Sequence, residues 1–268
     1  MTNAFEIVNR AFSKQSVNYD ADDSQNSILK EWRQQVYQHV HQFLKPGQPI
    51  LELNAGTGID AFHFAISGNP ILATDLSNGM VHEIERKIQA YQLSSIFTCR
   101  QLSYDQLNVI TDQKFDYVFS NFGGLNCIDD LSKVTRHLPS IMNKGGYVTW
   151  VIMPKVCVWE MLGIFKGNGR KALRRLKKSG VIAHLEGEYF PTYYHSLSDI
   201  KKAFSSSFRF IKSEGLGSIS PPPHRDDLAK QHQRLYKGLR KIDAVVRNSF
   251  PFNRWGDHII ITFQFNPQ

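Results

Sequence analysis

Short apolar runs alternate with amphipathic stretches through the first 153 residues of the chain. Five of these runs are rich in β-branched or aromatic side chains, which is typical of buried strands. They lie at residues 50–53, 71–75, 96–100, 114–120 and 147–153. Since helix-like stretches connect them, the pattern predicts a parallel sheet with right-handed crossovers. The carboxyl ends of the strands then face one cleft.

The amphipathic stretches have apolar residues three or four positions apart, as one face of a helix requires. Residues 1–46 are predicted to be helical, with an apolar face made by Ile28, Trp32, Val36, Val40 and Phe43. Pro46 and Gly47 end this helix. Ser77 is placed to cap a helix that carries Met80, Val81, Ile84 and Ile88 on one side. A further helix over 128–142 leads into the fifth strand.

After residue 153 the pattern becomes less regular. It predicts helices over 154–165 and from there to Lys178, whose apolar positions, among them Leu173 and Leu176, let them dock on the domain as a cap. Two short strands follow, 181–185 and 189–194, which the pattern predicts as a hairpin over the cleft. The remaining predicted elements are a helix from 194 to 200, strands at 208–215 and 259–265, and between them a basic amphipathic helix that ends near 247.

The turn after the first apolar run has the composition of a ligand-binding turn. Gly56 and Gly58 let a ligand approach the backbone, and the helix that starts there presents free N–H groups. Gly56, Gly58 and Ala61 fit the dinucleotide fingerprint, with Asp75 at about the distance expected for a ribose contact. Glu52, however, would repel a pyrophosphate and attract a cation. S-adenosylmethionine carries an ammonium and a sulfonium and no phosphate, so it suits Glu52 and Asp75 better.

Residues 52–58, Glu-Leu-Asn-Ala-Gly-Thr-Gly, resemble the first motif of the class I S-adenosylmethionine-dependent methyltransferases, an acid followed by alternate glycines. Asn54 stands where glycine is usual, and asparagine tolerates a left-handed conformation better than most residues. Lys-Gly-Gly at 144–146 also resembles the family. Residues 11–20, which end in Tyr-Asp, look like the amino-terminal segment of small-molecule members of the quinone- and biotin-pathway type.

The resemblance implies a single α/β domain with a doubly wound, mostly parallel seven-stranded sheet, the Rossmann-like methyltransferase fold. It also implies an antiparallel last strand and a cap made of helices and a hairpin. We expect an N-terminal helical lid at 1–46, a cofactor-binding core at 47–153, a cap insertion at 154–196, and the rest of the sheet with a helical insertion at 197–268.

Site residues also follow from the resemblance. Asp75 is expected to bind the ribose diol, and Leu76 and Met80 to line the adenine. Ser103 stands where the family often has an acid for the adenine amino group, so its hydroxyl or the backbone of Tyr104 would replace that contact. The predicted cofactor-binding residues are Tyr19 as a lid residue, Glu52, Asn54, Ala55, Gly56, Gly58, Asp75, Leu76, Met80, Ser103, Tyr104 and Asn121.

Composition adds a broad class. A chain of 268 residues with 41% hydrophobic content can bury a full core. It has no apolar run long enough to span a bilayer and no signal-peptide pattern at its start, so we expect a cytoplasmic protein. Cys99, Cys127 and Cys157 are odd in number and far apart, which predicts reduced thiols and no metal site.

The formal charge of +8 is compatible with acidic substrates, RNA or an anionic membrane surface, and does not choose among them. Much of it lies in one segment, at Lys166, Arg170, Lys171, Arg174, Arg175, Lys177 and Lys178. We interpret this segment as a solvated face of the cap, which makes RNA unlikely as a partner. The loop after the fourth strand lacks the Asn/Asp-Pro-Pro-aromatic sequence of nucleobase amino methyltransferases, so DNA is not expected either.

The function predicted from these observations is transfer of a methyl group from S-adenosylmethionine to a small molecule, with an oxygen favoured as acceptor. Tyrosines and a phenylalanine at 189–194 predict an aromatic or extended apolar acceptor, and an acidic acceptor is the alternative. His195 and His184 are the candidate bases, with His224 as a third. The alternatives are an RNA or protein methyltransferase, a non-catalytic cofactor-binding protein and, last, a dehydrogenase.

Overall fold

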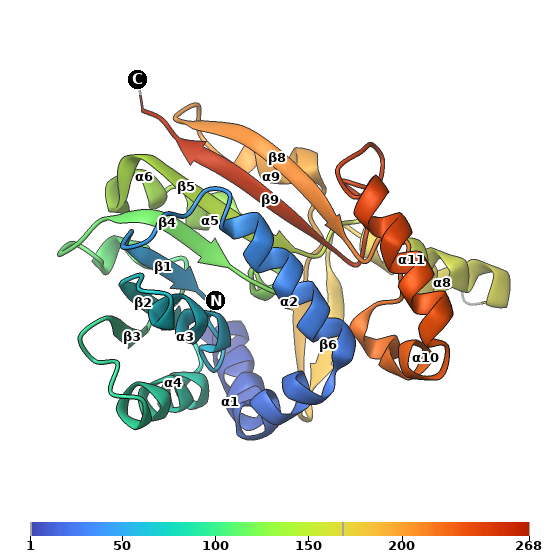
Figure 1. Ribbon diagram of the computed structural model, residues 1–268, viewed down its shortest axis with the longest axis horizontal. Helices are drawn as coiled ribbons and strands as arrows, with labels where there is room; N and C mark the ends of the chain where they lie inside the picture. Colours follow the sequence, from blue (N-terminus) through green and yellow to red (C-terminus); the bar gives the residue numbers. More distant parts are fainter. Residues whose placement is uncertain (1, 168, 268) are drawn as a thin grey trace.

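A seven-stranded sheet runs through the centre of the computed structural model, which describes residues 2–167 and 169–267 (Figure 1). Its strand order is β3-β2-β1-β4-β5-β9-β8. The strands are β1 (Ile50–Leu53), β2 (Ile71–Asp75), β3 (Phe97–Gln101), β4 (Phe115–Ser120), β5 (Met142–Ile152), β8 (Phe208–Leu216) and β9 (His258–Phe265). The first five pair in parallel, and β9 is antiparallel to both of its neighbours. The predicted fold is therefore confirmed.

Helices cover both faces of this sheet (Figure 1). The longer ones are α1 (Thr2–Gln25), α2 (Ser27–Val40), α3 (Ile59–Ile66), α4 (Asn78–Ala90), α9 (Leu197–Ala203), α10 (Asp226–Gln231) and α11 (Gln233–Val246). The sequence predicts one helical region over residues 1–46. Within the described residues, Asn26 divides this region into α1 and α2. The side chain of Asn26 caps α2 by accepting from Leu29 N at 3.0 Å. None of the helices in the described ranges is long and apolar enough to cross a bilayer.

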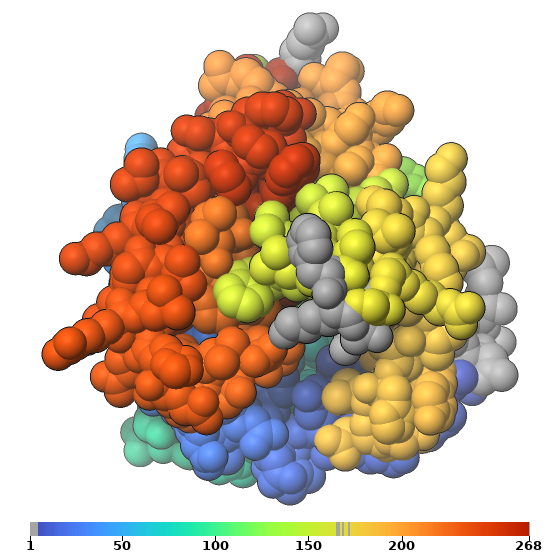
Figure 2. Space-filling model, turned by 90° about the vertical axis from the view of Figure 1, so that its right-hand side faces the viewer, coloured from blue at the N-terminus to red at the C-terminus, as the bar shows by residue number. Residues whose placement is uncertain are grey.

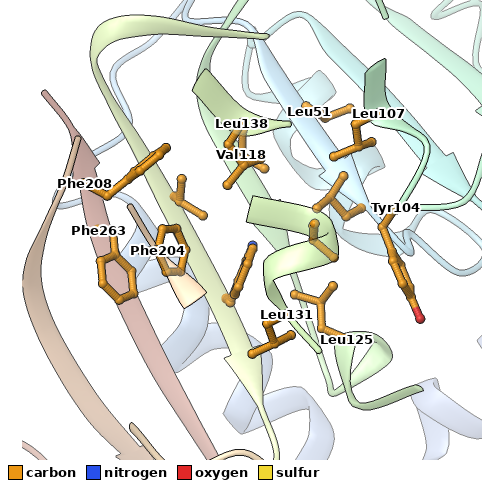
Figure 3. Packing of buried hydrophobic residues seen from close by; sticks show 14 of the residues in the cluster. Leu51, Tyr104, Leu107, Val118, Leu125, Leu131, Leu138, Phe204, Phe208 and Phe263 are labelled. Atoms are coloured by element: carbon orange, nitrogen blue, oxygen red, sulfur yellow. The ribbon is translucent and has the colours of Figure 1, made fainter. Parts of the chain in front are cut away.

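The strands bury side chains in two hydrophobic cores, one on each face of the sheet. Alternation along β1 sends Leu51 and Leu53 to one core and Ile50 to the other. Figure 3 shows the first core, in which Val118 of β4 lies beside Leu138 and, farther along the sheet, Phe204 lies beside Phe263. The second core includes Trp32 of α2, which is fully buried. Burial on both faces explains why these strands are almost entirely apolar.

The predicted helix over 128–142 is wrong. Two four-residue helices, α5 (Ser132–Thr135) and α6 (Leu138–Ile141), stand in its place, and β5 already begins at Met142. Pro139 lies in the first turn of α6, where its missing N–H does no harm, but it cannot continue a preceding helix. The break therefore follows from proline chemistry that the apolar periodicity hid.

The predicted helices between 154 and 178 are also wrong in extent. The chain there forms α7 (Val158–Met161), α8 (Gly169–Ala172) and 3₁₀ turns at Leu162–Lys166 and Arg174–Leu176. Gly167 takes a left-handed φ of 76°, which ends the helical run. The side chains of Phe165, Lys166 and Lys171 lie outside the described part of the structure.

Leu173 and Leu176 do not dock on the domain as expected, since they are 44% and 49% exposed. Arg175 holds this segment to the body instead. Its Nη2 lies 2.7 Å from Asp257 Oδ1, and its Nε donates to Glu160 Oε1 at 2.9 Å. The hairpin that follows, β6 (Val181–Leu185) and β7 (Glu188–Thr192), forms as predicted.

Strand register places the candidate chemistry at one edge of the sheet. Leu53 of β1 lies opposite Thr74 of β2 on one side and Ser120 of β4 on the other. The next residue of each strand or turn is polar, namely Asn54, Asp75 and Asn121. These three side chains consequently meet at the carboxyl ends of the central strands, where open parallel sheets bind ligands.

Candidate active site

A cavity of about 310 Å³ lies over the carboxyl edge of the sheet. Gly56 and Asp75 line it from the sheet side. Phe12 of α1 and Phe190 of β7 line it from the opposite side, and their ring centroids are 5.8 Å apart. The N-terminal helix and the hairpin therefore roof the cavity together.

Eight of the twelve predicted cofactor-binding residues line this cavity. They are Tyr19, Asn54, Gly56, Asp75, Leu76, Met80, Tyr104 and Asn121. Glu52 and Ala55 line a smaller pocket that adjoins it and shares Gly56 with it. Gly58 and Ser103 line neither of the two. Gly58 caps α3 at a φ of 77°, and the Ser103 hydroxyl donates to Asp105.

The glycine turn is held by the carboxylate of Asp75. Gly56 N donates to Asp75 Oδ2 at 2.9 Å, and Ser77 N donates to Asp75 Oδ1 at 2.8 Å. Burial raises the pKa of Asp75 to about 6, although these N–H groups oppose the shift. A ligand with hydroxyl donors would favour the ionised form.

Asn54 adopts the left-handed conformation predicted for it, with φ 45°. Its Oδ1 accepts from Ser120 Oγ at 3.1 Å, while its buried Nδ2 has no hydrogen-bond partner among the described residues. Gly124 comes so close that an added Cβ would lie 2.2 Å from this nitrogen. A glycine is therefore required at 124, where the loop after β4 packs against the glycine turn.

The smaller pocket holds a buried carboxyl group with an unpartnered oxygen. Glu52 is 1% exposed, and its Oε2 makes no hydrogen bond within the described part of the chain. Burial, and then the negative charge of Asp60, raise the pKa of Glu52 well above its ordinary value. A cation bound in this pocket would satisfy the oxygen and favour the ionised carboxyl.

Arg33 and Asp60, which sequence reasoning missed, form the wall of this pocket. Arg33 Nη1 lies 2.5 Å from Asp60 Oδ1 and Nη2 lies 2.6 Å from Asp23 Oδ1. Burial would raise the pKa of Asp60, but the guanidinium of Arg33 and hydrogen bonds from Arg33, Tyr37 and Asn121 hold it below its ordinary value. No spacing in the sequence singles out Arg33, which lies beside the apolar face of its helix.

Helix α1 is fastened over the glycine turn by charged and polar contacts. Asp20 accepts from Thr57 Oγ1 at 2.5 Å and pairs with Lys87 Nζ at 2.5 Å. The neighbouring Tyr19 ring lies over Gly56, 3.9 Å from the position of an added Cβ. Burial raises the pKa of Tyr19 to about 12, so its phenol stays neutral.

The same helix is fastened to the hairpin. Lys14 Nζ lies 2.9 Å from Glu188 Oε1, and Arg10 Nη2 lies 3.2 Å from Glu188 Oε2. Hydrogen bonds from these two cations lower the pKa of Glu188 to about 2. Both halves of the roof are therefore joined through one carboxylate.

The three candidate histidines lie in different places. His184 on β6 lines the cavity, and its ring lies 4.6 Å from that of Tyr189. His195 lies outside the residues that line the cavity, and it is buried with Nε2 3.1 Å from the Ile128 carbonyl oxygen. His224 is exposed on a 3₁₀ turn and does not line the cavity. Of these three, only His184 borders the cavity. Its side chain is exposed on the outer face of the hairpin beside Tyr189, because Ala183 and Leu185 occupy the alternate positions on the cavity side.

One cluster has potential metal ligands that the sequence did not reveal. Ligand atoms of Cys157, Glu160 and Asp257 lie within 4.8 Å of one another. The guanidinium of Arg175 bonds to both carboxylates and supplies the positive charge there. The cluster therefore anchors the cap and offers no vacancy for a cation.

Comparisons with known proteins agree with this geometry. Residues 50–146 match the family model described as a methyltransferase domain. No curated protein matches the sequence. The structure of a DhpI–SAH complex is 14% identical, covers 100% of both chains and has a TM-score of 0.60.

Two further solved structures share the fold. A putative S-adenosylmethionine-dependent methyltransferase from Listeria monocytogenes is 15% identical over 86% of this chain and 96% of its own, with a TM-score of 0.59. The [4+2]-cyclase SpnF is 13% identical over 88% and 82%, with a TM-score of 0.56. At such identities the likeness is one of fold.

The residues present fit S-adenosylmethionine. The unpartnered buried oxygen of Glu52 suits an ammonium group, and the absence of a side chain at Gly56 leaves room for a ligand under Tyr19. Leu76 and Met80 offer apolar contacts for a base next to the carboxylate of Asp75.

Proposed function

We propose that the chain is a class I S-adenosylmethionine-dependent methyltransferase, as the family match over residues 50–146 and the shared fold support, and that it methylates an oxygen of a small, uncharged and largely apolar acceptor. The observation that carries this proposal is the two-sided cavity. Polar cofactor residues lie on the sheet side, while the roof contributes Val8, Phe12, Leu185 and Phe190. Apolar walls of this kind favour an aromatic or aliphatic acceptor.

Charge on the walls also supports an uncharged acceptor. Among the described residues that line the cavity there is no lysine or arginine, so an acidic acceptor would meet no countercharge from them. Arg10 and Lys14, the cations of the roof, both pair with Glu188 and lie outside the residues that line the cavity. An RNA substrate would need the opposite arrangement, with cations around the opening.

The chain's own residues divide the work between cofactor and acceptor. When bound, S-adenosylmethionine supplies a methyl group on a sulfonium for in-line displacement. We assign Asp75 to the ribose hydroxyls and Glu52 to the ammonium group. Arg33 is assigned to the carboxylate of the methionyl group. The roof excludes water and orients the acceptor, which is the main source of rate in such a displacement.

His184 is the proposed base. It is the only one of the three histidines that borders the cavity, its exposed ring lies beside that of Tyr189, and its ring nitrogens make no hydrogen bond to the described residues. A neutral imidazole can take the proton from an acceptor hydroxyl as the new bond to oxygen forms.

We also propose that the domain divides into four parts, with boundaries after residues 46, 153 and 196. A cytoplasmic location is a further proposal, supported by the free cysteines.

Turnover measurements with a panel of acceptors test the proposal. Formation of S-adenosylhomocysteine is followed with neutral phenols and long-chain alcohols, with carboxylic acids, with amines and with single-stranded RNA. We expect turnover with the neutral hydroxyl compounds, reduced about 100-fold by His184→Ala and unchanged by His224→Ala. Turnover with amines or RNA alone would contradict the acceptor class. Cofactor binding with no turnover on any acceptor would favour the non-catalytic alternative.

A further inference from the structure

Basic residues gather at one end of the molecule. Residues 161–180 and 228–255, which we call the basic end, contain 14 of the 32 lysines and arginines but only one of the 24 acidic residues. In Figure 1 these residues include α8 and α11, at the right-hand end. Figure 2 looks onto this end and shows both segments on the same face. The charge is therefore concentrated on one surface.

Exposed apolar side chains gather on the same segments. Of the 16 large hydrophobic residues that are exposed in the described part of the chain, ten belong to the basic end. They are Met161, Leu162, Ile164, Leu173, Leu176, Leu235, Ile242, Val245, Phe250 and Trp255. Single exposed apolar residues are ordinary on a protein surface, whereas such a concentration marks an interaction surface.

Helix α11 shows how the two kinds of residue are arranged. At 100° per residue, Leu235 and Ile242 share one stripe, and Arg234 and Lys241 border it on one side. The buried face of the helix, represented by Tyr236, lies about 100° away on the other side. The apolar stripe of α11 therefore lies on the flank of the helix, exposed beside its buried face.

Half of the 14 cations of the basic end are free to meet a partner. The one acid of the basic end, Asp243, is 2% exposed and accepts from Ile219 N at 2.7 Å. Glu160, beside the first segment, is occupied by Arg174 and Arg175. Seven exposed cations make no ion pair with the described residues, namely Arg170, Lys177, Lys178, Arg234, Lys237, Lys241 and Arg254.

We propose that the basic end docks on the surface of a lipid bilayer that contains anionic lipids. Cations next to an exposed aliphatic stripe are the features with which a helix lies in a bilayer interface. The cations are attracted by the lipid phosphates, and the apolar residues enter the region below the headgroups. This surface is separate from the cavity, so the proposal does not depend on the acceptor proposed above.

The apolar residues distinguish a bilayer from RNA. RNA phosphates would explain the cations, but Leu235, Ile242 and Val245 have no role in phosphate binding. Single-stranded RNA is usually bound by stacking on aromatic rings, and eight of the ten exposed apolar residues are not aromatic. A surface of aliphatic residues bordered by cations fits lipid better.

Vesicle co-sedimentation tests the proposal on the full chain at about 0.1 M salt, with vesicles of phosphatidylcholine alone or with about 30% phosphatidylglycerol. One variant, Leu235→Gln with Val245→Gln, removes apolar contacts, and Ile66→Gln with Val109→Gln is its matched control, since all four residues are exposed. A second variant changes Arg234, Lys237 and Lys241 to Gln, with Lys45, Lys114 and Lys144 changed to Gln as control. The variants are first checked for wild-type thermal unfolding and cofactor binding.

We expect the wild type to bind the anionic vesicles at least about tenfold more tightly than the neutral ones. Both variants of the basic end should lose most of this binding, while both controls keep it. The proposal is wrong if the wild type does not bind anionic vesicles. It is also wrong if only the charge variant loses binding and single-stranded RNA displaces the vesicles, because the surface would then recognise phosphates alone.

Discussion

The carboxylate of Asp75 accepts a hydrogen bond from the backbone N–H of Gly56, with 2.9 Å between Oδ2 and the nitrogen. This bond joins the end of β2 to the glycine turn after β1. Both groups line the cavity. The acid proposed to hold the ribose therefore also holds the turn that admits the cofactor.

Replacing Asp75 with asparagine should weaken cofactor binding. The change keeps the size of the side chain but removes the charge that ribose hydroxyls would meet, and hydrogen bonds to a charged group contribute about 1.5–3 kcal/mol each. We expect the dissociation constant of S-adenosylhomocysteine, measured by calorimetry, to rise at least about tenfold. An unchanged constant in a folded variant would place the ribose elsewhere.

Cofactor affinity should also depend on pH through this residue. Since burial raises the pKa of Asp75 to about 6, the ligand-free protein takes up a proton as the pH falls through 6. Protonation removes the acceptor, so affinity should decline between about pH 7.5 and pH 5. The stability of the ligand-free protein depends on pH in the opposite direction. Because the folded pKa of Asp75 is raised, its contribution to stability is present at low pH and is lost as the pH rises through 6. Calorimetry over this range should show a flatter profile for Asp75→Asn than for the wild type.

Sequence patterns predicted the parts of the molecule that depend on local chemistry. The five parallel strands follow from apolar runs, and the turn at Gly56 follows from glycine spacing. The left-handed φ of Asn54 follows from what asparagine tolerates. Each of these depends on residues within a few positions of one another.

The rest depends on contacts between distant segments. Arg33 bonds to Asp60, 27 positions away, and Lys14 bonds to Glu188, 174 positions away. The sequence around either residue of a pair does not identify its partner. His195 could not be told apart from His184 in the sequence, because only the path of the hairpin decides which of them lines the cavity. The helix over 128–142 failed for another reason, since apolar periodicity outweighed Pro139 in the prediction.

Gly56→Ala should abolish cofactor binding while the protein remains folded. An added Cβ at Gly56 would lie 3.9 Å from the Tyr19 ring, which is ordinary contact, but it would fill space that a ligand needs. The φ of 57° adds about 1–2 kcal/mol of strain. Gly68→Ala is the control, since its φ is 89° and nothing lies within 4 Å. Both variants should lose similar stability in urea, and only Gly56→Ala should lose binding.

Glu188→Gln should loosen the roof. The change removes the carboxylate that joins Arg10 and Lys14 of α1 to the hairpin. We expect S-adenosylhomocysteine to dissociate a few-fold faster in stopped-flow measurements, and added salt to narrow the difference from the wild type. Glu186→Gln, two positions earlier and outside these ion pairs, should behave as the wild type. Equal dissociation rates at low salt would mean that the cofactor leaves without separating α1 from the hairpin.

The last prediction concerns a buried histidine that joins α2 to the sheet. His39 is 1% exposed, with Nδ1 2.8 Å from Glu214 Oε2 and Nε2 2.8 Å from Thr262 Oγ1. Burial lowers the pKa of His39 and outweighs the opposing effect of Glu214. The ring is therefore neutral, donating from Nδ1 to Glu214 and accepting from Thr262 at Nε2.

His39→Leu should lower the free energy of unfolding by about 2–3 kcal/mol at pH 7.5, because Glu214 loses a buried donor. The loss should shrink at pH 5.5. A histidine whose folded pKa lies below its unfolded value of about 6.5 stabilises the protein less as the pH falls through that value, since the unfolded chain then binds the proton and the folded one does not. Urea unfolding at both pH values measures this, with His41→Leu on the exposed side of the same helix end expected to change stability by less than about 0.5 kcal/mol. An equal loss at both pH values would mean that His39 takes up its proton in the folded state as readily as in the unfolded one, and that Glu214, not burial, sets its pKa.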